Sequence, residues 1–438
     1  MNKHVTRLTA LALALALMLP LAACGGGKAG GQDEPTVSTT TPTETAGPTG
    51  PSEPPAEPPA ETAAPAVDPE DAVRNYWKPE QLTQAWGPNQ VVEHLFVHPV
   101  IAYPEFAFTS PTISADQKKG LDDFMVTADE YVKSLESQYA KGYILVNMDE
   151  VWSEYTNEQG QTRMQRNTLM LPEGKKPLVF SFDDVNYYDY MLAEGFMSKL
   201  ILGADGDIWA YGVNPFTGEE TINKDLDATT ILDEFVREHP DFSLNGAKGC
   251  FSLTGFQGIL GYRTQNDIDI GPNDPARPAF DAKRQSEIDA VKPIVQRLKD
   301  TGWTFGCHTW GHIRLPKQSM ASLQKDVLRW QDEVGSLVGP TNIIFYPFGG
   351  RPDDDKDQSK SYSEQFKWLQ SIGYRVFASV GINSYSQIKT GISAVICDRL
   401  HPDGTTLRGA KSLERYSQFY DAREIIDLSV RPNYGVGW

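Results

Sequence analysis

Two adjacent carboxylates, Asp183 and Asp184, directly follow the apolar run 178–182. A short run rich in Val and Phe, introduced by Gly174 and Pro177, is typical of a buried strand in a parallel sheet. Neighbouring carboxylates repel each other, so a metal ion, a proton or a strong hydrogen-bond donor is expected beside them. Taken alone, the pair is explained equally well as a solvated turn where a strand ends.

Two histidines four residues apart, His308 and His312, supply a partner for these acids. On a helical turn this spacing would place both imidazoles on one face, close enough to bind one cation. They follow the run 303–307, which has the character of a strand reaching the same end of the sheet. Two histidines and one aspartate make a metal site with open positions, which suits metal-assisted hydrolysis. A pair of surface histidines is the alternative.

The segments between these residues must form elements that bring them together. Apolar residues spaced by three and four predict amphipathic helices over 121–139, 288–298 and 323–334, the second of them kinked or begun near Pro293. Short apolar segments that read as strands lie at 92–102, 143–146, 249–255, 342–347 and 376–380. Helices that alternate with strands are the sequence form of parallel βα units, so the expected fold class is α/β.

Three segments resemble the motifs of the NodB-type polysaccharide deacetylases. They are Ser181-Phe182-Asp183-Asp184, His308-Thr309-Trp310-Gly311-His312 and Tyr346-Pro347-Phe348-Gly349. The resemblance runs from about residue 94 to residue 401 and implies a distorted (β/α) barrel. It also implies an enzyme that hydrolyses acetyl groups from polysaccharide.

The resemblance assigns roles to the acids and histidines. Asp184, His308 and His312 are expected to bind a divalent cation, with Zn²⁺ as the first candidate. Asp183 is expected to act as the general base, since the first Asp of this motif is the base in the family. A carboxylate beside a metal-bound water suits that role physically.

The third motif and the end of the region imply further groups. The Tyr346 backbone N–H is expected to donate to the oxyanion, and His401, in Arg399-Leu400-His401, to act as the general acid. Many family members carry an arginine that orients the base where this chain has Phe345. Arg399 and Arg351 are the candidates to replace it.

The chain begins with features of an export signal. Lys3 and Arg7 precede a short apolar block that ends in Leu-Ala-Ala-Cys, which resembles a bacterial lipobox. We therefore expect a signal peptide over 1–23 and a lipid attached to Cys24, with an ordinary secretory signal as the alternative. Residues 24–68 are rich in Pro, Thr, Glu and Ala and are expected to form an extended tether. The protein would then be extracytoplasmic and anchored to the bacterial cell membrane.

The rest of the chain is expected to divide into an amino-terminal part of the catalytic region, 69–170, and the deacetylase core, 171–438. The 438-residue chain has a formal net charge of -18, which argues against a nucleic-acid partner. Besides Cys24 the chain has Cys250, Cys307 and Cys397, too few for a disulfide framework. Cys307 is expected to be a buried thiol and not a metal ligand.

These observations predict a metal-dependent hydrolase that removes acetyl groups from N-acetylated or O-acetylated cell-surface polysaccharide. The alternative is a glycan-binding surface lipoprotein that keeps the metal site without catalysis. His98, in a segment similar to the opening strand of extracellular deacetylases, either points into the site or is a core histidine. Tyr187 and Tyr188 are expected to pack in the core, with sugar contact as the alternative.

Overall fold

The computed structural model describes residues 68–352, 363–389, 393–432 and 435–438. The compact unit spans Val67–Trp438. The predicted signal peptide, the lipidation site Cys24 and the tether up to residue 67 lie outside the described residues. The expected division between residues 170 and 171 lies within the compact unit.

A parallel sheet forms the centre of this unit. In chain order, its strands are β2 (Glu93–Val97), β7 (Lys176–Asp183), β11 (Cys250–Leu253), β12 (Thr304–Cys307), β13 (Ile343–Phe345), β14 (Val376–Val380) and β16 (Ala394–Arg399). This is also their order in the sheet, read from β2. Two further strands join it: β3 (Tyr143–Leu145) pairs with the start of β7, and β15 (Tyr385–Lys389) runs antiparallel to β16.

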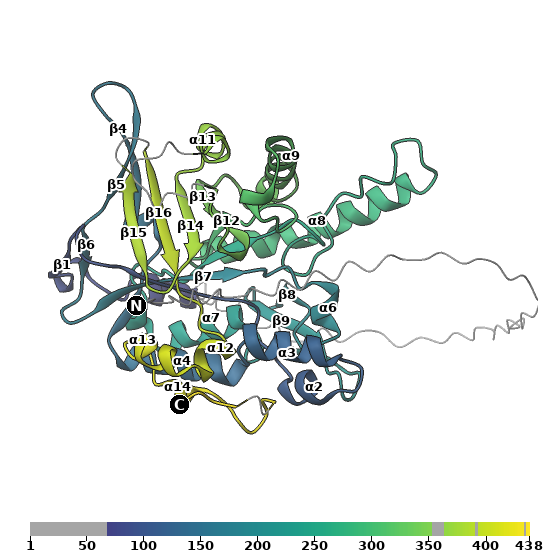
Figure 1. Ribbon diagram of the computed structural model, residues 1–438, viewed down its shortest axis with the longest axis horizontal. Coiled ribbons are helices and arrows are strands. Elements are labelled where there is room, and N and C mark those ends of the chain that lie inside the picture. The colour runs from purple at the N-terminus through teal and green to yellow at the C-terminus, as the bar shows by residue number, and fades with distance from the viewer. Residues whose placement is uncertain (1–67, 353–362, 390–392, 433–434) are drawn as a thin grey trace, which may run out of the picture. The chain divides into compact units, whose positions relative to one another are not determined.

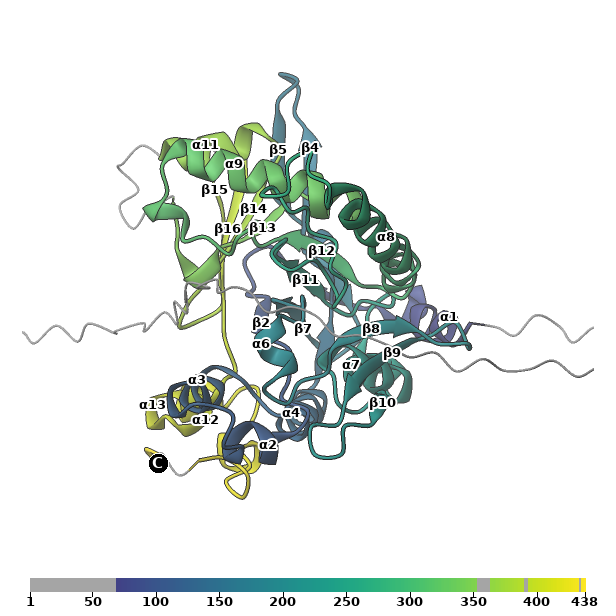
Figure 2. The same ribbon diagram turned by 90° about the vertical axis from the view of Figure 1, so that its right-hand side faces the viewer.

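The two ends of the parallel sheet meet. Leu95 of β2 forms a parallel bridge with Leu400, just beyond β16. The Phe96 N–H donates to the Leu400 carbonyl, and the Leu400 N–H donates to the His94 carbonyl, both at 2.9 Å. The sheet therefore closes into the expected distorted (β/α) barrel, seen from two sides in Figures 1 and 2.

Strand β7 is buried along nearly its whole length, from Pro177 to Asp183. Its residues do not alternate between apolar and polar because both faces of a parallel barrel strand are covered. Phe180 and Phe182 face the covering helices, where each ring lies 6.4 Å from that of Tyr131, and Phe182 also contacts Trp303 with ring centroids 5.0 Å apart. This packing holds the end of β7, and with it Asp183, in a rigid position.

Helices cover the barrel where the sequence predicts them, with two differences in extent. They include α4 (Ala128–Ala140), α8 (Arg277–Asp300), α9 (Met320–Trp330) and α11 (Glu364–Ser371). The predicted helix 121–139 is broken, because α3 (Ala115–Phe124) ends in an extended residue, Met125. Thr127 then caps α4 in a reciprocal pair with Glu130. Helix α8 begins well before Pro293, which lies inside it.

Additional elements surround the barrel. They are α1 (Pro69–Arg74), β1 (Gln84–Trp86), α2 (Pro104–Thr109), α5 (Met148–Val151), β4 (Trp152–Thr156), β5 (Thr162–Arg166), β6 (Leu169–Leu171), α6 (Asp189–Leu192), β8 (Lys199–Leu202), β9 (Ile208–Val213), β10 (Glu220–Asn223), α7 (Ala228–Glu238), α10 (Ser336–Val338), α12 (Gly404–Arg408), α13 (Ala410–Tyr416) and α14 (Ala422–Ile425). The β4–β5 hairpin projects from the body in both views (Figures 1 and 2).

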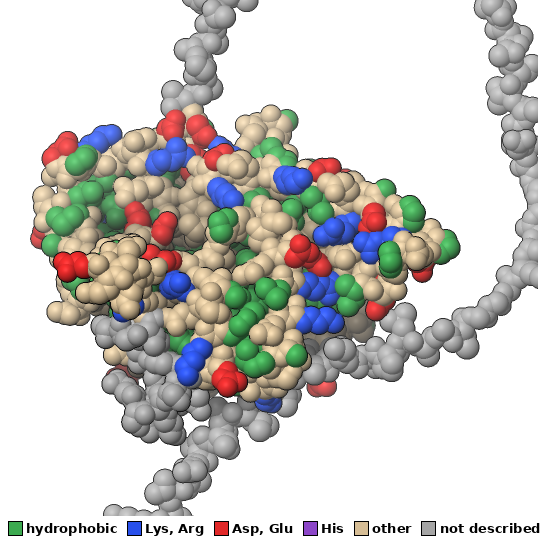
Figure 3. Space-filling model, turned by 90° about the horizontal axis from the view of Figure 1, so that it is seen from above, with side chains coloured by type: hydrophobic (Ala, Val, Ile, Leu, Met, Phe, Trp, Pro, Cys, Tyr) green, Lys and Arg blue, Asp and Glu red, His purple; other side chains and the backbone are tan. Residues whose placement is uncertain are grey.

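The carboxy-terminal segment is attached by a buried ion cluster. The Arg431 guanidinium donates to Asp122 at 2.9 Å and to Glu130 at 2.6 Å, and all three side chains are inaccessible to solvent. On the face shown in Figure 3, acidic and basic side chains are interspersed. Over the described ranges, no helix is both long and apolar enough to cross a bilayer.

Candidate active site

The site is built where neighbouring strands end. Asp183 is the last residue of β7, His308 follows the end of β12, and Tyr346 follows the end of β13. Because β7, β11, β12 and β13 are parallel neighbours, these ends lie at one edge of the barrel. The three segments that resemble family motifs therefore converge in space.

The three expected metal ligands are brought together. One carboxylate oxygen of Asp184 and one ring nitrogen each of His308 and His312 lie within 4.8 Å of one another. The His308 Nδ1–H donates to the Phe345 carbonyl at 3.0 Å, which leaves Nε2 without a proton and able to bind a metal. A buried carboxylate with two such imidazoles fits a divalent cation, and Zn²⁺ in particular takes these ligand types.

The histidine pair is held differently from the prediction. The segment between the two histidines forms no helix. It is a turn in which Thr309 and His312 have positive φ angles of 62° and 50°, and the ring centroids of His308 and His312 are 4.8 Å apart. The imidazoles meet because of this turn geometry and not because of helical spacing.

Left-handed backbone conformations are frequent in the segments that form the site. The non-glycine residues with positive φ include Asp184, Tyr187, Thr309, His312 and Phe348. Such residues cost about 1–3 kcal/mol each and persist where the surrounding structure determines them. Four of these five belong to the three converging segments, and Tyr187 follows the first of them.

Asp183 is paired with Arg399, the last residue of β16. The guanidinium donates from Nη1 and Nη2 to the two carboxylate oxygens at 2.6 and 2.9 Å, and it lies between the rings of Phe96 and Phe345, 4.2 and 4.6 Å from their centroids. Burial alone would raise the pKa of Asp183, but the charges of Arg399 and His308 and the hydrogen bonds from Arg399 together outweigh it and hold the pKa well below its usual range. Arg351 instead pairs with Asp398.

This pairing decides between the two arginines considered from sequence. Arg399, and not Arg351, is the arginine that pairs with Asp183, and Phe345 packs against it.

The expectation for Tyr346 is corrected. Its backbone N–H donates to the Ala378 carbonyl at 2.8 Å, because the β13–β14 pairing continues one residue beyond β13. This N–H is therefore engaged in a hydrogen bond between neighbouring strands and is not available to a substrate. Phe348 borders the site, with its ring 4.4 Å from that of His312, and no acceptor for its backbone N–H is found among the described residues.

His401 reaches the site through a second histidine. Its Nε2 is 3.0 Å from His98 Nδ1, and its Nδ1–H donates to Asp403 at 3.0 Å. The other nitrogen of His98, Nε2, is 4.0 Å from a carboxylate oxygen of Asp184. His98 is thus the imidazole that faces the metal-ligand set. Its pKa is lowered to about 4, chiefly by burial and secondly by the charge of the nearby His401. The role of His401 stays a prediction.

The two tyrosines after the acids are both buried, as expected for packing. Tyr187 is inaccessible to solvent, and its hydroxyl donates to Asp227 at 2.7 Å. Tyr188 is 9% exposed, and its hydroxyl donates to Asp184 at 2.8 Å. Cys307 is a buried free thiol whose pKa is raised to about 12 by burial, so it is not poised to bind a metal.

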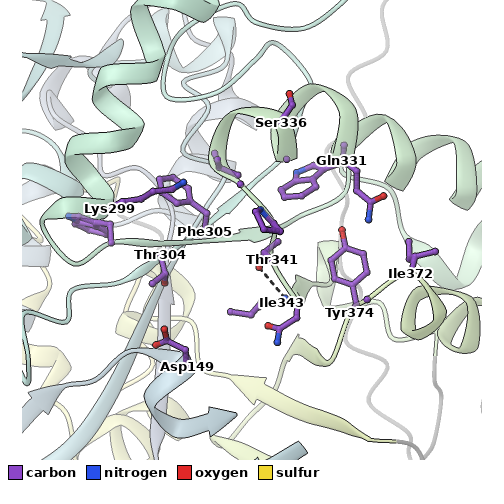
Figure 4. A pocket seen from close by; sticks show the side chains of 18 residues that line it. Asp149, Lys299, Thr304, Phe305, Gln331, Ser336, Thr341, Ile343, Ile372 and Tyr374 are labelled. Atoms are coloured by element: carbon purple, nitrogen blue, oxygen red, sulfur yellow. Dashed lines mark hydrogen bonds between the residues drawn. The ribbon is translucent and has the colours of Figure 1, made fainter. Parts of the chain in front are cut away.

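A cavity of about 940 Å³ lies at the opposite end of the strands. Its lining includes Thr304 and Ile343, the first residues of β12 and β13, together with Lys299 and Tyr374 (Figure 4). The metal-ligand residues follow the other ends of these strands. The cavity is therefore separate from the candidate active site.

Comparison with known proteins supports the motif assignment. Residues 280–365 match the polysaccharide deacetylase family, and this segment contains both histidines and the Tyr346–Gly349 segment. No curated protein matches the sequence.

Solved structures with some similarity include three such proteins. They are the Streptococcus pyogenes deacetylase PplD in complex with acetate (13% identity, 72% of this chain and 94% of that chain, TM-score 0.35), BC0361, a polysaccharide deacetylase from Bacillus cereus (12%, 75% and 69%, 0.39), and IcaB from Ammonifex degensii (11%, 71% and 91%, 0.34). These similarities are weak, so the identification depends on the family match and the motifs. On that basis, the segment 280–365 is assigned to the polysaccharide deacetylase family of hydrolases, and the three motifs resemble its NodB type.

Proposed function

We propose that this protein is a metal-dependent deacetylase acting on N-acetylated polysaccharide at the bacterial cell surface, with O-acetylated polysaccharide as the alternative substrate. The observation that carries the proposal is the set of Asp184, His308 and His312, gathered within 4.8 Å beside a second, separately held carboxylate. A binding protein would need the ligands but would have no use for the adjacent Asp183–Arg399 pair.

The two aspartates are suited to different tasks. A divalent cation bound by Asp184, His308 and His312 would polarise the acetyl carbonyl and lower the pKa of a bound water. Asp183 is not assigned as a metal ligand, because both its oxygens accept hydrogen bonds from Arg399. Asp183 is ionised at neutral pH, as a proton acceptor for the attacking water must be, and the pairing with Arg399 that lowers its pKa trades base strength for a fixed position.

Proton delivery to the leaving amine is assigned to His401 acting through His98. Asp403 accepts a hydrogen bond from His401 Nδ1–H at 3.0 Å, so a protonated His401 would pass its Nε2 proton to His98 Nδ1, 3.0 Å away, as His98 Nε2 gives its own proton to the amine. The chain of contacts ends at His98 Nε2, which faces the site. The ring of His401 is also stacked on Phe96, with centroids 4.3 Å apart, which fixes its orientation.

The oxyanion requires a donor besides the cation. The Phe348 backbone N–H is the candidate, since Phe348 has a positive φ of 57° beside His312. Preorganised backbone donors of this kind contribute about 2.7–4 kcal/mol of transition-state stabilisation.

The proposed cellular location depends on the sequence of the amino terminus. The apolar block before Leu-Ala-Ala-Cys24 supports export and lipid attachment. The Pro-rich stretch after it supports an extended tether between the lipid and the catalytic domain, so the substrate would be a polymer of the cell envelope.

The test is acetate release by purified protein. The protein is stripped with a chelator, dialysed, and assayed on a panel of N-acetylated and O-acetylated glycans before and after addition of Zn²⁺, Co²⁺ or Mn²⁺. We expect release that depends on added metal and is greatest on an N-acetylated polymer. Release that is unaffected by the chelator, with no metal in the protein, would refute metal dependence.

A further inference from the structure

Three side chains form a hydrogen-bonded chain that ends on a metal-ligand candidate. The Tyr188 hydroxyl donates to Asp184 Oδ1 at 2.8 Å and lies 2.5 Å from Thr254 Oγ1. Tyr188 has one hydroxyl proton, and an ionised Asp184 can only accept. Thr254 must therefore be the donor to Tyr188, which makes the direction of the chain Thr254 to Tyr188 to Asp184.

The two oxygens of Asp184 have different surroundings. Oδ1 is held by Tyr188, whereas Oδ2 is 3.7 Å from His312 Nε2 and 4.0 Å from His98 Nε2. The hydrogen bond from Tyr188 thus selects which oxygen faces the imidazoles. A carboxylate at the end of a strand would otherwise rotate about its terminal torsion, which is broad.

The surroundings of Tyr188 keep this donor in place. Its ring is stacked on Tyr190, with centroids 5.9 Å apart and an interplanar angle of 23°, and it contacts Phe256 at 6.2 Å. Thr254 is fixed in turn, because the Asn186 side-chain amide donates to its carbonyl at 2.9 Å. The whole chain is assembled in the interior.

We propose that Tyr188 is a positioning residue for the metal site: its hydroxyl holds Asp184 so that Oδ2 alone is presented to the cation. This inference rests on the proposed metal-dependent function. Outer-shell hydrogen bonds to a metal ligand typically change metal affinity by about 10- to 100-fold when they are removed.

Tyr187 provides a matched control in the adjacent position. It is also buried, and its hydroxyl also donates to a carboxylate, but that carboxylate is Asp227, the N-cap of α7. Tyr187→Phe and Tyr188→Phe therefore each remove one buried hydroxyl from one carboxylate. Only Tyr188→Phe removes it from a metal-ligand candidate.

The experiment measures the Kd of Zn²⁺ for the full-length metal-free variants by competition with a chromophoric chelator. We expect Tyr188→Phe to raise the Kd by about 10- to 100-fold and Tyr187→Phe to leave it within about threefold of wild type. The melting temperature of each metal-free protein reports folding separately. In the Co²⁺ forms, the visible absorption spectrum should change only in Tyr188→Phe.

Equal Kd values for wild type and Tyr188→Phe, or equal shifts in both tyrosine variants, would overturn the inference. If Tyr188→Phe does not fold, Thr254→Val tests the same chain from its far end and should raise the Kd in the same direction by a smaller factor. An unchanged Kd in that variant would then overturn the inference. Absence of Zn²⁺ binding by the wild type would instead refute the proposed metal site itself.

Discussion

Replacing Arg399 with methionine would leave Asp183 buried without its positive partner. Methionine keeps an unbranched side chain between Phe96 and Phe345, so the packing changes little while the charge is lost. In the native protein the guanidinium donates to both oxygens of Asp183 and, at 2.9 Å, to Ser181 Oγ. All of these bonds are lost together.

The magnitude follows from the burial of the pair. The Arg399 side chain is inaccessible to solvent and that of Asp183 is 4% exposed. Removing one partner of a buried ion pair costs about 3–5 kcal/mol of folding stability. Arg351→Met is the matched control, since Arg351 and Asp398 are 28% and 22% exposed and a pair of that kind contributes about 1 kcal/mol or less.

The contribution of the Asp183–Arg399 pair to folding stability changes with pH in a predictable direction. Since Arg399 lowers the pKa of Asp183, the pair stabilises the protein above the ordinary pKa of 3.8, and this contribution is lost as the pH falls through the lowered value. In Arg399→Met, burial raises the pKa of Asp183 instead. The stability difference between wild type and variant should therefore be large at pH 7 and smaller at pH 4, where the variant has protonated Asp183.

Urea unfolding at pH 7 and pH 4 measures the stability, and kcat/KM for acetate release against pH measures the catalytic effect. We expect kcat/KM to fall by about 10²-fold at pH 7 through misplacement of the base, with the acidic limb displaced to higher pH. Equal losses in Arg399→Met and Arg351→Met, or an acidic limb that does not move, would refute the assignment of Arg399 as the partner of Asp183.

Three further outcomes are expected. Replacing Asp184, His308 or His312 singly with Ala should remove most of the zinc measured by elemental analysis, and stoichiometric zinc in all three variants would exclude the site. Burial raises the pKa of Glu194 from 4.5 to about 7, which destabilises the folded state above pH 7 and not below pH 4.5. Glu194→Gln should therefore raise the melting temperature at pH 8 more than at pH 4.5, and an equal change at both would contradict this. Cys24→Ala should release the protein from salt-washed membranes, and retention in the membrane fraction would exclude the lipid anchor.

The parts of the site that could be predicted from sequence are local ones. Asp183 and Asp184 follow an apolar run directly, and His308 follows another, so the rule that polar residues at parallel strand ends meet at one edge was enough to place them. The spacing of His308 and His312 indicated one shared site although the turn between them is not helical.

The parts that could not be predicted depend on closure of the barrel. Arg399 ends β16 and His98 follows β2, so both were candidates from sequence, but their partners Asp183 and Asp184 are set by the closure of the barrel, where Leu95 bridges Leu400. The sequence did contain the pattern that marks a site residue, since Arg399 and His98 end or follow apolar strand segments, as Asp183 does. The assignment of Tyr346 failed for another reason, because hydrogen-bond register past a strand end depends on its neighbour β14 and is invisible in one segment.

The most direct test of the account compares Asp183→Asn with wild type in acetate release under metal-saturating conditions. Asparagine keeps the size of the side chain but cannot accept the proton, so bound zinc should be unchanged while kcat falls by about 10²- to 10⁴-fold. Equal rates of acetate release from the two zinc-loaded proteins would contradict the account, because Asp183 would then not be the base.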